Sequence, residues 1–99
     1  MKKVRAHLII SGRVQGVCFR METRRAAKRQ GNVYGWVKNL IGGTVEAVLE
    51  GNESDVKAMV EWCRKGPPGS LVTDMKLNWE SYNGTYDAFD QHRMLNGKR

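Results

Sequence analysis

The chain has 99 residues, of which 40% are hydrophobic and 27% are charged, and its 17 Lys and Arg against 10 Asp and Glu give a net charge of +7. This composition excludes a disordered chain and fits one domain with one core, and no apolar run approaches the roughly 20 residues of a membrane-spanning helix. The charge favours anionic partners such as phosphorylated metabolites, nucleic acid or acidic membranes, although many small soluble proteins are basic without using the charge.

The beginning of the chain does not resemble a secretory signal, because its apolar run, Leu8–Ile10, is shorter than the roughly 7–15 residues that such a signal needs. The two cysteines, Cys18 and Cys63, are too few for a disulfide framework and form no C-x-x-C motif. Both histidines are far from them in sequence, so no metal site is predicted. We therefore expect a cytoplasmic protein with free thiols, no metal and no cofactor.

The first predicted element is a strand over residues 4–10, because apolar residues alternate there with Arg5 and His7. A loop from Gly12 to Phe19 follows. Helix-favouring residues then predict a helix over 20–30, ended by a Gly-Asn pair. The exposed face of this helix is basic and is formed by Arg24, Arg25, Lys28 and Arg29.

The middle of the chain predicts a hairpin and a second helix. "NVYGWVKNL" and "TVEAVLE" are typical of strands, and Gly42-Gly43 between them forms a turn. Glu46 and Glu50 are expected on the polar face of the second of these strands. Asn52 is expected to cap the next helix, whose apolar stripe follows helical spacing and consists of Val56, Met59, Val60 and Cys63.

The remaining segments predict two more strands. "GPPGS" stops the second helix, "LVTDMKLNW" is a strand, "YNGTYD" a turn, and "AFDQHR" a short strand in the last hairpin or at an edge. The order β-α-β-β-α-β predicts an α+β, ferredoxin-like sandwich, in which two helices cover one face of an antiparallel sheet. This fold alone indicates no function.

The loop before the first helix has the features of an anion site. A strand leads through a glycine-bearing loop to a helix N-terminus, where backbone N–H groups lack partners and the helix dipole is positive. Gly12 and Gly16 permit a close approach of a ligand, and Arg20 could hold a phosphate at two oxygens. From spacing alone, a structural turn with an exposed arginine is favoured over such a site. Neither G-x-x-x-x-G-K-[ST] nor G-x-G-x-x-G is present, so nucleotide binding by this loop is not indicated.

Asn39 is a second candidate, because asparagine is depleted in strands and this one closes the strand "GWVKN". It can be a turn residue before the two glycines. Alternatively, its carboxamide, which both donates and accepts hydrogen bonds, could hold a water molecule in line with a bound phosphate. Trp36 is close enough in sequence to border such a site.

Together, "GRVQGVCFR", "GWVKN" and "GTVEAVLEG" resemble the acylphosphatase family over a region from Val4 to about Phe89. The resemblance implies a ferredoxin-like fold and metal-free hydrolysis of acyl phosphates to a carboxylate and inorganic phosphate. It also implies that Arg20 binds the phosphate and that Asn39 orients the attacking water. The backbone N–H groups implied as the phosphate cradle are those of Gln15, Gly16, Val17, Cys18 and Phe19.

On this interpretation the chain is a monomer that acts on a small-molecule acyl phosphate. Residues 1–93 are expected to form one acylphosphatase-like domain and residues 94–99 a flexible basic tail. Three features depart from the family pattern, of which one is a shift of the Gly31-Asn32 pair relative to the usual apolar-Gly pair. Cys18 stands where many members carry glycine; we expect a negative φ there and no nucleophilic role. Gln91 stands where the last strand is usually apolar.

The predicted fold is also compatible with two other functions. The same strand order occurs in RNA-recognition domains, which stack bases on aromatic residues of the two central strands. The segments expected at these positions, "AHLIIS" and "TVEAVLE", contain no aromatic residue, so no nucleic-acid partner is expected. The fold also occurs as a domain of larger maturation proteins, but a free-standing enzyme is the simpler interpretation of this chain.

Overall fold

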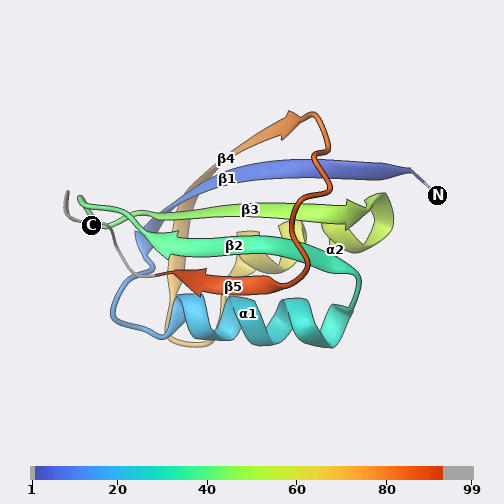
Figure 1. The fold of residues 1–99 in the computed structure, drawn as a ribbon. Coiled ribbons are helices and arrows are strands. Elements are labelled where there is room, and N and C mark those ends of the chain that lie inside the picture. The colour runs from blue at the N-terminus through green and yellow to red at the C-terminus, as the bar shows by residue number, and fades with distance from the viewer. Residues whose placement is uncertain (1, 93–99) are drawn as a thin grey trace.

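The computed structural model describes residues 2–92, so the predicted tail, residues 94–99, lies outside the described residues. The elements follow the order β-α-β-β-α-β, with one further strand (Figure 1). Their bounds are β1 Lys3–Arg13, α1 Phe19–Gln30, β2 Val33–Asn39, β3 Val45–Asn52, α2 Glu53–Lys65, β4 Leu71–Glu80 and β5 Phe89–His92.

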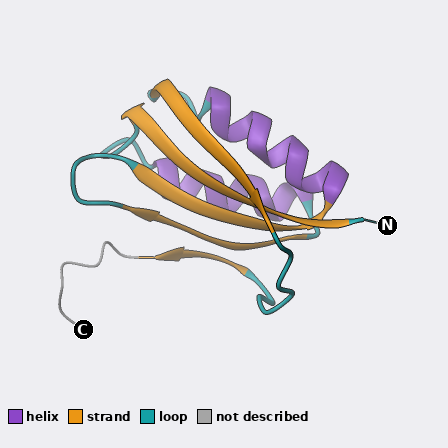
Figure 2. Ribbon diagram, turned by 90° about the horizontal axis from the view of Figure 1, so that it is seen from above, coloured by secondary structure: helices purple, strands orange, loops and turns teal. Residues whose placement is uncertain are grey.

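The strands form one sheet in the order β4-β1-β3-β2-β5, and both helices lie on the same side of it (Figure 2). This confirms the predicted α+β, ferredoxin-like class. Strands β1 to β4 pair antiparallel, as expected, but β5 pairs parallel to β2. The reason is the connection over residues 81–88, here called the strap. It crosses the helix-free face from the β4 edge to the opposite edge, so β5 arrives beside β2 and makes the sheet mixed (Figure 1).

The core lies between the sheet and the helices. Alternating residues of β1 point inward and stand opposite inward residues of β3, so that Leu8 pairs with Ala47 and Ile10 with Val45. All four of these side chains have no exposed surface. The apolar stripe of α2 packs against them, which confirms the helical spacing read from the sequence; its buried members are Val56, Met59, Val60 and Cys63.

Gly35 explains why β2 can lie so close to β3. Its φ is +135°, and a Cβ atom built there would lie 2.0 Å from the carbonyl oxygen of Val48. Any other residue would therefore push the two strands apart. The hairpin that joins them turns at the predicted glycines and is closed by a hydrogen bond of 2.8 Å from the N–H of Leu40 to the carbonyl of Thr44.

The N-terminus of α2 differs from the prediction. Asn52 occupies the position before the helix, but its side chain makes no capping hydrogen bond. Its Nδ2 instead donates to Asp55 over 3.4 Å. Its Oδ1 is buried without a hydrogen-bond partner among residues 2–92. The extended backbone of β3 runs directly into the helix, and the N–H of Glu53 donates to the carbonyl of Lys2. A main-chain carbonyl just before β1 thus replaces the expected side-chain cap.

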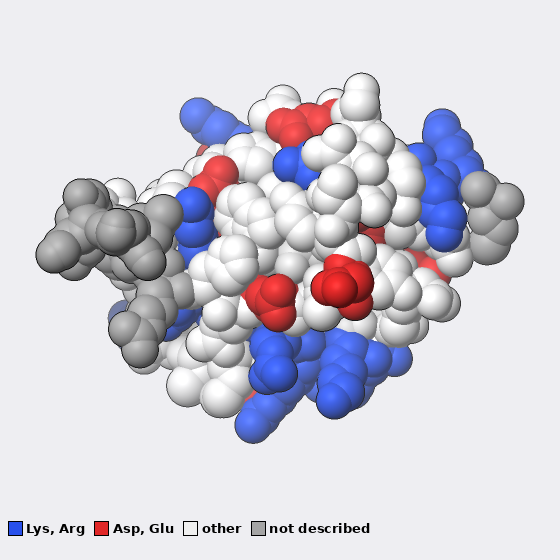
Figure 3. Space-filling model, viewed as in Figure 1, with Lys and Arg blue, Asp and Glu red and all other residues white. Residues whose placement is uncertain are grey.

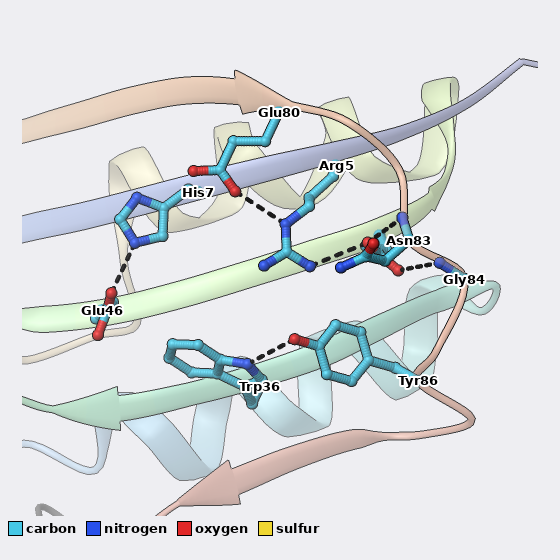
Figure 4. Close-up of polar contacts among 9 residues, drawn as sticks. Arg5, His7, Trp36, Glu46, Glu80, Asn83, Gly84 and Tyr86 are labelled. Atoms are coloured by element: carbon cyan, nitrogen blue, oxygen red, sulfur yellow. Dashed lines mark hydrogen bonds and ion pairs between the residues drawn. The ribbon is translucent and has the colours of Figure 1, made fainter.

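The helix-free face carries a buried carboxylate. Glu46 and Glu50 both lie on this face, as expected, but only 1% of Glu50 is exposed. Its carboxylate accepts hydrogen bonds from the N–H groups of Asn83 and Gly84 in the strap, at 2.8 and 3.1 Å (Figure 4). The buried charge therefore holds the strap on the sheet.

Arg5 supplies the positive partner of this carboxylate. Its Nη1 lies 3.0 Å from Glu50, and its Nε donates to Glu80 over 2.9 Å (Figure 4). Partial burial acts to lower the pKa of Arg5, but its hydrogen bonds to Glu80, Tyr86 and Glu50 outweigh this effect and raise the pKa overall. Arg5 therefore stays charged and neutralises Glu50.

The surface of α1 is basic, as predicted. Lys and Arg side chains gather over this helix in Figure 3, and the exposed ones are Arg24, Arg25, Lys28 and Arg29. Among the helices of residues 2–92, none has the length and apolar character needed to cross a membrane.

Candidate active site

The segment between β1 and α1 forms a loop with two left-handed residues. Gly16 has a φ of +74° and Cys18 a φ of +60°. The expected negative φ at Cys18 is therefore wrong. The residue that precedes a helix is ordinarily extended, but here the loop turns sharply into α1, and the backbone takes up the left-handed conformation although it is strained for a cysteine.

This geometry makes the main-chain N–H groups of the loop available to an anion. Within residues 2–92, no main-chain N–H from Gln15 to Met21 donates a hydrogen bond. Residues of negative φ alternate with Gly16 and Cys18, an arrangement in which successive N–H groups converge on one concavity. The last of these groups belong to the first turn of α1, where the helix dipole adds positive potential.

Arg20 lies in the first turn of α1 beside this concavity. Its Nη1 donates to the main-chain carbonyl of His92 over 2.6 Å. This contact ties the guanidinium to the end of β5, and among residues 2–92 the other donors of Arg20 make no further hydrogen bond. Arg20 is thus held by an element from the opposite end of the chain.

Asn39 reaches the same place from β2. It shares the inward face of β2 with Val37, and its side chain lines a cavity of about 360 Å³ together with Arg20. Of the predicted cradle residues, Val17 alone does not line this cavity; its side chain packs against the core. The lining residues are Val14, Gln15, Gly16, Cys18, Phe19, Arg20, Met21, Asn39 and Gln91.

Gln15 has a second role that sequence reasoning missed. Its Nε2 donates to the carbonyl of Leu40 over 2.8 Å and to that of Thr44 over 2.9 Å. Both acceptors belong to the turn that directly follows Asn39. The side chain of Gln15 therefore fastens the loop to the end of β2 and fixes the distance between the two halves of the cavity.

Gln91 is a polar lining residue of the cavity that sequence reasoning did not assign to the site. It stands opposite Val37 in the parallel pairing of β5 with β2, which turns it toward the helices and into the cavity. The signal was present in the sequence, because a polar residue stands where an apolar one is expected. The pairing of β5 with β2, which is needed to interpret this signal, could not be read from the sequence.

Trp36 does not border the cavity, contrary to expectation, because it lies on the opposite face of β2 from Asn39. Its ring stacks on that of His92 with 5.6 Å between centroids, and its Nε1 donates to the hydroxyl of Tyr86 over 3.1 Å (Figure 4). Trp36 thus packs against β5 on the helix-free face, at His92, whose carbonyl binds Arg20.

The cavity offers hydrogen-bond donors and positive charge, with no Asp, Glu or His among its lining residues. Within residues 2–92, His, Cys, Asp and Glu form no group of three that could hold a metal ion. Cys63 lies in the core, where burial raises the pKa of its thiol to about 12. The arrangement can bind an anion and orient a neutral nucleophile.

Comparison with known proteins gives a consistent result. A family model described as Acylphosphatase matches residues 6–91. A Thermococcus kodakarensis protein named acylphosphatase is 52% identical over 84 residues, which cover 85% of this chain and 91% of that protein. One from Pelotomaculum thermopropionicum is 45% identical, covering 90% and 96%. The solved structure of an acylphosphatase from Bacillus subtilis matches with a TM-score of 0.84 at 34% identity, covering 90% of this chain and 98% of that one.

Proposed function

The chain belongs to the acylphosphatase family, and from this premise we propose that it is an enzyme that hydrolyses acyl phosphates to a carboxylate and inorganic phosphate. In the proposed mechanism, Arg20 and the loop N–H groups hold the phosphate. Asn39 holds a water molecule that attacks phosphorus in line with the departing carboxylate. The observation that carries this proposal is the shared cavity, which Arg20, Asn39 and four of the five cradle residues line. Among residues 2–92, the main-chain N–H groups of that loop donate no hydrogen bond.

The cradle supplies charge stabilisation. In phosphoryl transfer, negative charge is spread over three equatorial oxygens, and catalysis consists mainly of positioning and electrostatic stabilisation. The backbone N–H groups of Gln15 to Phe19 and the free donors of Arg20 are suited to these oxygens. Because their positions are fixed by the loop and by His92, they need little reorganisation during the reaction.

Asn39 supplies the position of the nucleophile. Its carbonyl can accept a hydrogen bond from water while its amide donates one, so that the water is aligned with phosphorus. A carboxylate is a good leaving group, so a strong general base is not required. This agrees with a cavity lined by no Asp, Glu or His.

The test is the hydrolysis of benzoyl phosphate, followed by its loss of ultraviolet absorbance, with and without a metal chelator. We expect activity that the chelator does not change. Arg20→Ala should raise KM and remove most activity, and Asn39→Ala should lower kcat about a hundredfold or more with little change in KM. Matched controls are Arg64→Ala and Asn78→Ala, which change exposed residues away from the cavity.

Two outcomes would contradict the proposal. Purified wild-type protein without hydrolytic activity would remove its basis. An Asn39→Ala variant as active as the Asn78→Ala control would remove the assigned role of the amide. Circular dichroism spectra of all variants separate loss of function from loss of fold.

We also propose that the enzyme acts in the cytoplasm as a monomer, and that residues 1–93 form a single acylphosphatase-like domain followed by a flexible basic tail, residues 94–99. Removal of residues 94–99 should then leave kcat/KM unchanged within about twofold, since a change below about 0.4 kcal/mol marks an uninvolved segment. Light scattering of the eluting peak from a sizing column measures the mass. A dimer, or a large loss of activity on truncation, would contradict this assignment.

A further inference from the structure

A second cavity lies at the opposite end of the sheet from the candidate active site. Its volume is about 450 Å³. It is formed where the beginning of β1, the first turns of α2, the end of β4 and the start of the strap meet. The loop over residues 14–18, called the phosphate loop after its proposed role, follows the other end of β1, whose 11 residues span roughly 35 Å. The two cavities share no lining residue.

Two aromatic side chains form the walls of this second cavity. Trp79 is 48% exposed and Tyr82 is 44% exposed. Large aromatic rings are usually better buried, whereas these two are both partly exposed and line the same cavity. They are therefore suited to a flat ring as a ligand.

The wall that carries Tyr82 is held firmly. The ring of Tyr82 packs against Gly84, where an added Cβ atom would lie 3.0 Å from Cε2 of the tyrosine. The N–H of Gly84 donates to the buried carboxylate of Glu50, as does that of Asn83 (Figure 4). The cavity wall is thus anchored by the same buried charge that holds the strap, so it is largely formed before any ligand binds.

The remaining lining of the cavity is rich in ammonium groups. Lys2, Lys3 and Lys57 all line it, and Figure 3 shows basic side chains gathered at the end of the molecule where Figure 1 places the N-terminus. Lys2 and Lys57 share a single carboxylate, that of Glu53, at 3.8 and 3.3 Å. Within residues 2–92, Lys3 makes no ion pair.

The second carboxylate of the lining is already engaged. Glu80 accepts a hydrogen bond from Arg5 over 2.9 Å on the helix-free face (Figure 4). Three ammonium groups are therefore offset in the cavity by one available carboxylate, that of Glu53. The cavity combines free aromatic surface with an excess of positive charge.

From this combination we infer that the cavity binds a planar aromatic ring that carries a phosphate, of about the size of a nucleoside monophosphate. The ring stacks on Trp79 and contacts Tyr82. Its phosphate is bound by the lysines, whose flexible ammonium groups act as point charges for phosphate. A bare anion would leave the aromatic surface unused, and an uncharged ring would leave the lysines uncompensated.

The probe is adenosine 5′-monophosphate, titrated by isothermal calorimetry at physiological salt into the wild-type protein and into Arg20→Ala. The second protein removes the main phosphate contact of the candidate active site. We expect one saturable site in both. Adenosine lacks the phosphate and ribose 5-phosphate lacks the ring. Each should bind at least about tenfold more weakly than adenosine 5′-monophosphate, because each loses one of the two kinds of contact.

Variants locate the site. Trp79→Ala and the double variant Lys3→Gln/Lys57→Gln should each weaken binding about tenfold, since each removes one kind of contact. Lys76→Gln removes one positive charge from an exposed position of β4 outside the cavity and should change binding by less than about twofold. Tyr82→Ala provides a second aromatic variant if Trp79→Ala does not fold.

Absence of saturable binding of adenosine 5′-monophosphate to the Arg20→Ala variant would overturn the inference. So would equal affinity for adenosine and its monophosphate, or aromatic and lysine variants that bind as tightly as Lys76→Gln. Hydrolysis of benzoyl phosphate by Trp79→Ala should stay at the wild-type rate, so failure of this inference and failure of the proposed enzymatic function are distinguishable.

Discussion

At the scale of single residues, Cys18 shows how the site determines the backbone. Its left-handed φ of +60° occurs where the loop that lines the cavity turns into α1, but the Cβ atom makes this conformation costly. The sequence contains no local reason for a cysteine to be left-handed, because the requirement comes from the turn into α1. The strain is local, since Cys18 is exposed.

Cys18→Gly should therefore stabilise the protein by about 1 kcal/mol, because glycine adopts positive φ without strain; this gain exceeds its greater entropy in the unfolded state. Urea unfolding measures the change, and hydrolysis of benzoyl phosphate should be retained. The matched control is Cys63→Ala, which removes a buried sulfur and should destabilise. If Cys18→Gly is clearly less stable than wild type, the strain assigned to Cys18 is wrong.

Cys63 leads to a prediction about alkaline pH. Burial raises the pKa of its thiol from 9.0 to about 12. Between these two pH values the folded protein keeps the thiol proton, whereas the unfolded chain loses it. The resulting stabilisation is complete below pH 9 and is lost as the pH rises toward 12. The loss is up to about 1.4 kcal/mol per pH unit. Because lysines and tyrosines titrate in the same range, the measured quantity is the difference between wild type and Cys63→Ala. A difference independent of pH from 8 to about 11 would contradict this cause.

At the scale of elements, Gln15 joins the phosphate loop to the hairpin that follows Asn39. Gln15→Met removes both hydrogen bonds from its Nε2 and leaves the carbonyls of Leu40 and Thr44 without this donor. We expect kcat to fall about tenfold or more with little change in KM, because Asn39 shifts relative to the bound phosphate. Steady-state kinetics measures both constants. Gln30→Met, which breaks an exposed hydrogen bond to Asp55, is the control, and equal kinetics in the two variants would argue against this positioning role.

Most elements could be predicted because their signals are local. The alternation in β1, the helical stripe of α2 and the glycines of the hairpin each depend on neighbouring residues. The place of β5 could not be predicted in this way, because no local pattern tells whether "AFDQHR" returns beside β4 or crosses to β2. The contribution of Gln91 to the cavity was missed for the same reason. The resemblance led us to expect Arg20 and Asn39 in one site, and they do line one cavity; spacing alone favoured an ordinary turn. Their roles stay a prediction.

At the scale of the whole molecule, the strap joins the two edges of the sheet through one buried charge. Glu50→Gln would leave Arg5 without its buried partner and turn an amide N–H₂ toward the N–H groups of the strap. We expect a loss of stability of about 3 kcal/mol, measured by urea unfolding. Glu80→Gln breaks the more exposed ion pair of Arg5 and should cost less than about 1 kcal/mol. Equal losses in the two variants would show that burial of Glu50 is not the decisive factor.

The parallel pairing of β5 also has a consequence for biosynthesis. β5 lies near the end of the described chain, yet it pairs with β2 from the first half, and its His92 carbonyl binds Arg20. During translation the phosphate loop leaves the ribosome early but lacks this support until β5 follows. Because distant strand pairs form late and at an entropic cost, a nascent chain should acquire activity only after β5 has emerged and paired with β2. Chains arrested before β5 would contain Arg20 and Asn39 but lack the His92 carbonyl that binds Arg20, so they are expected to be inactive.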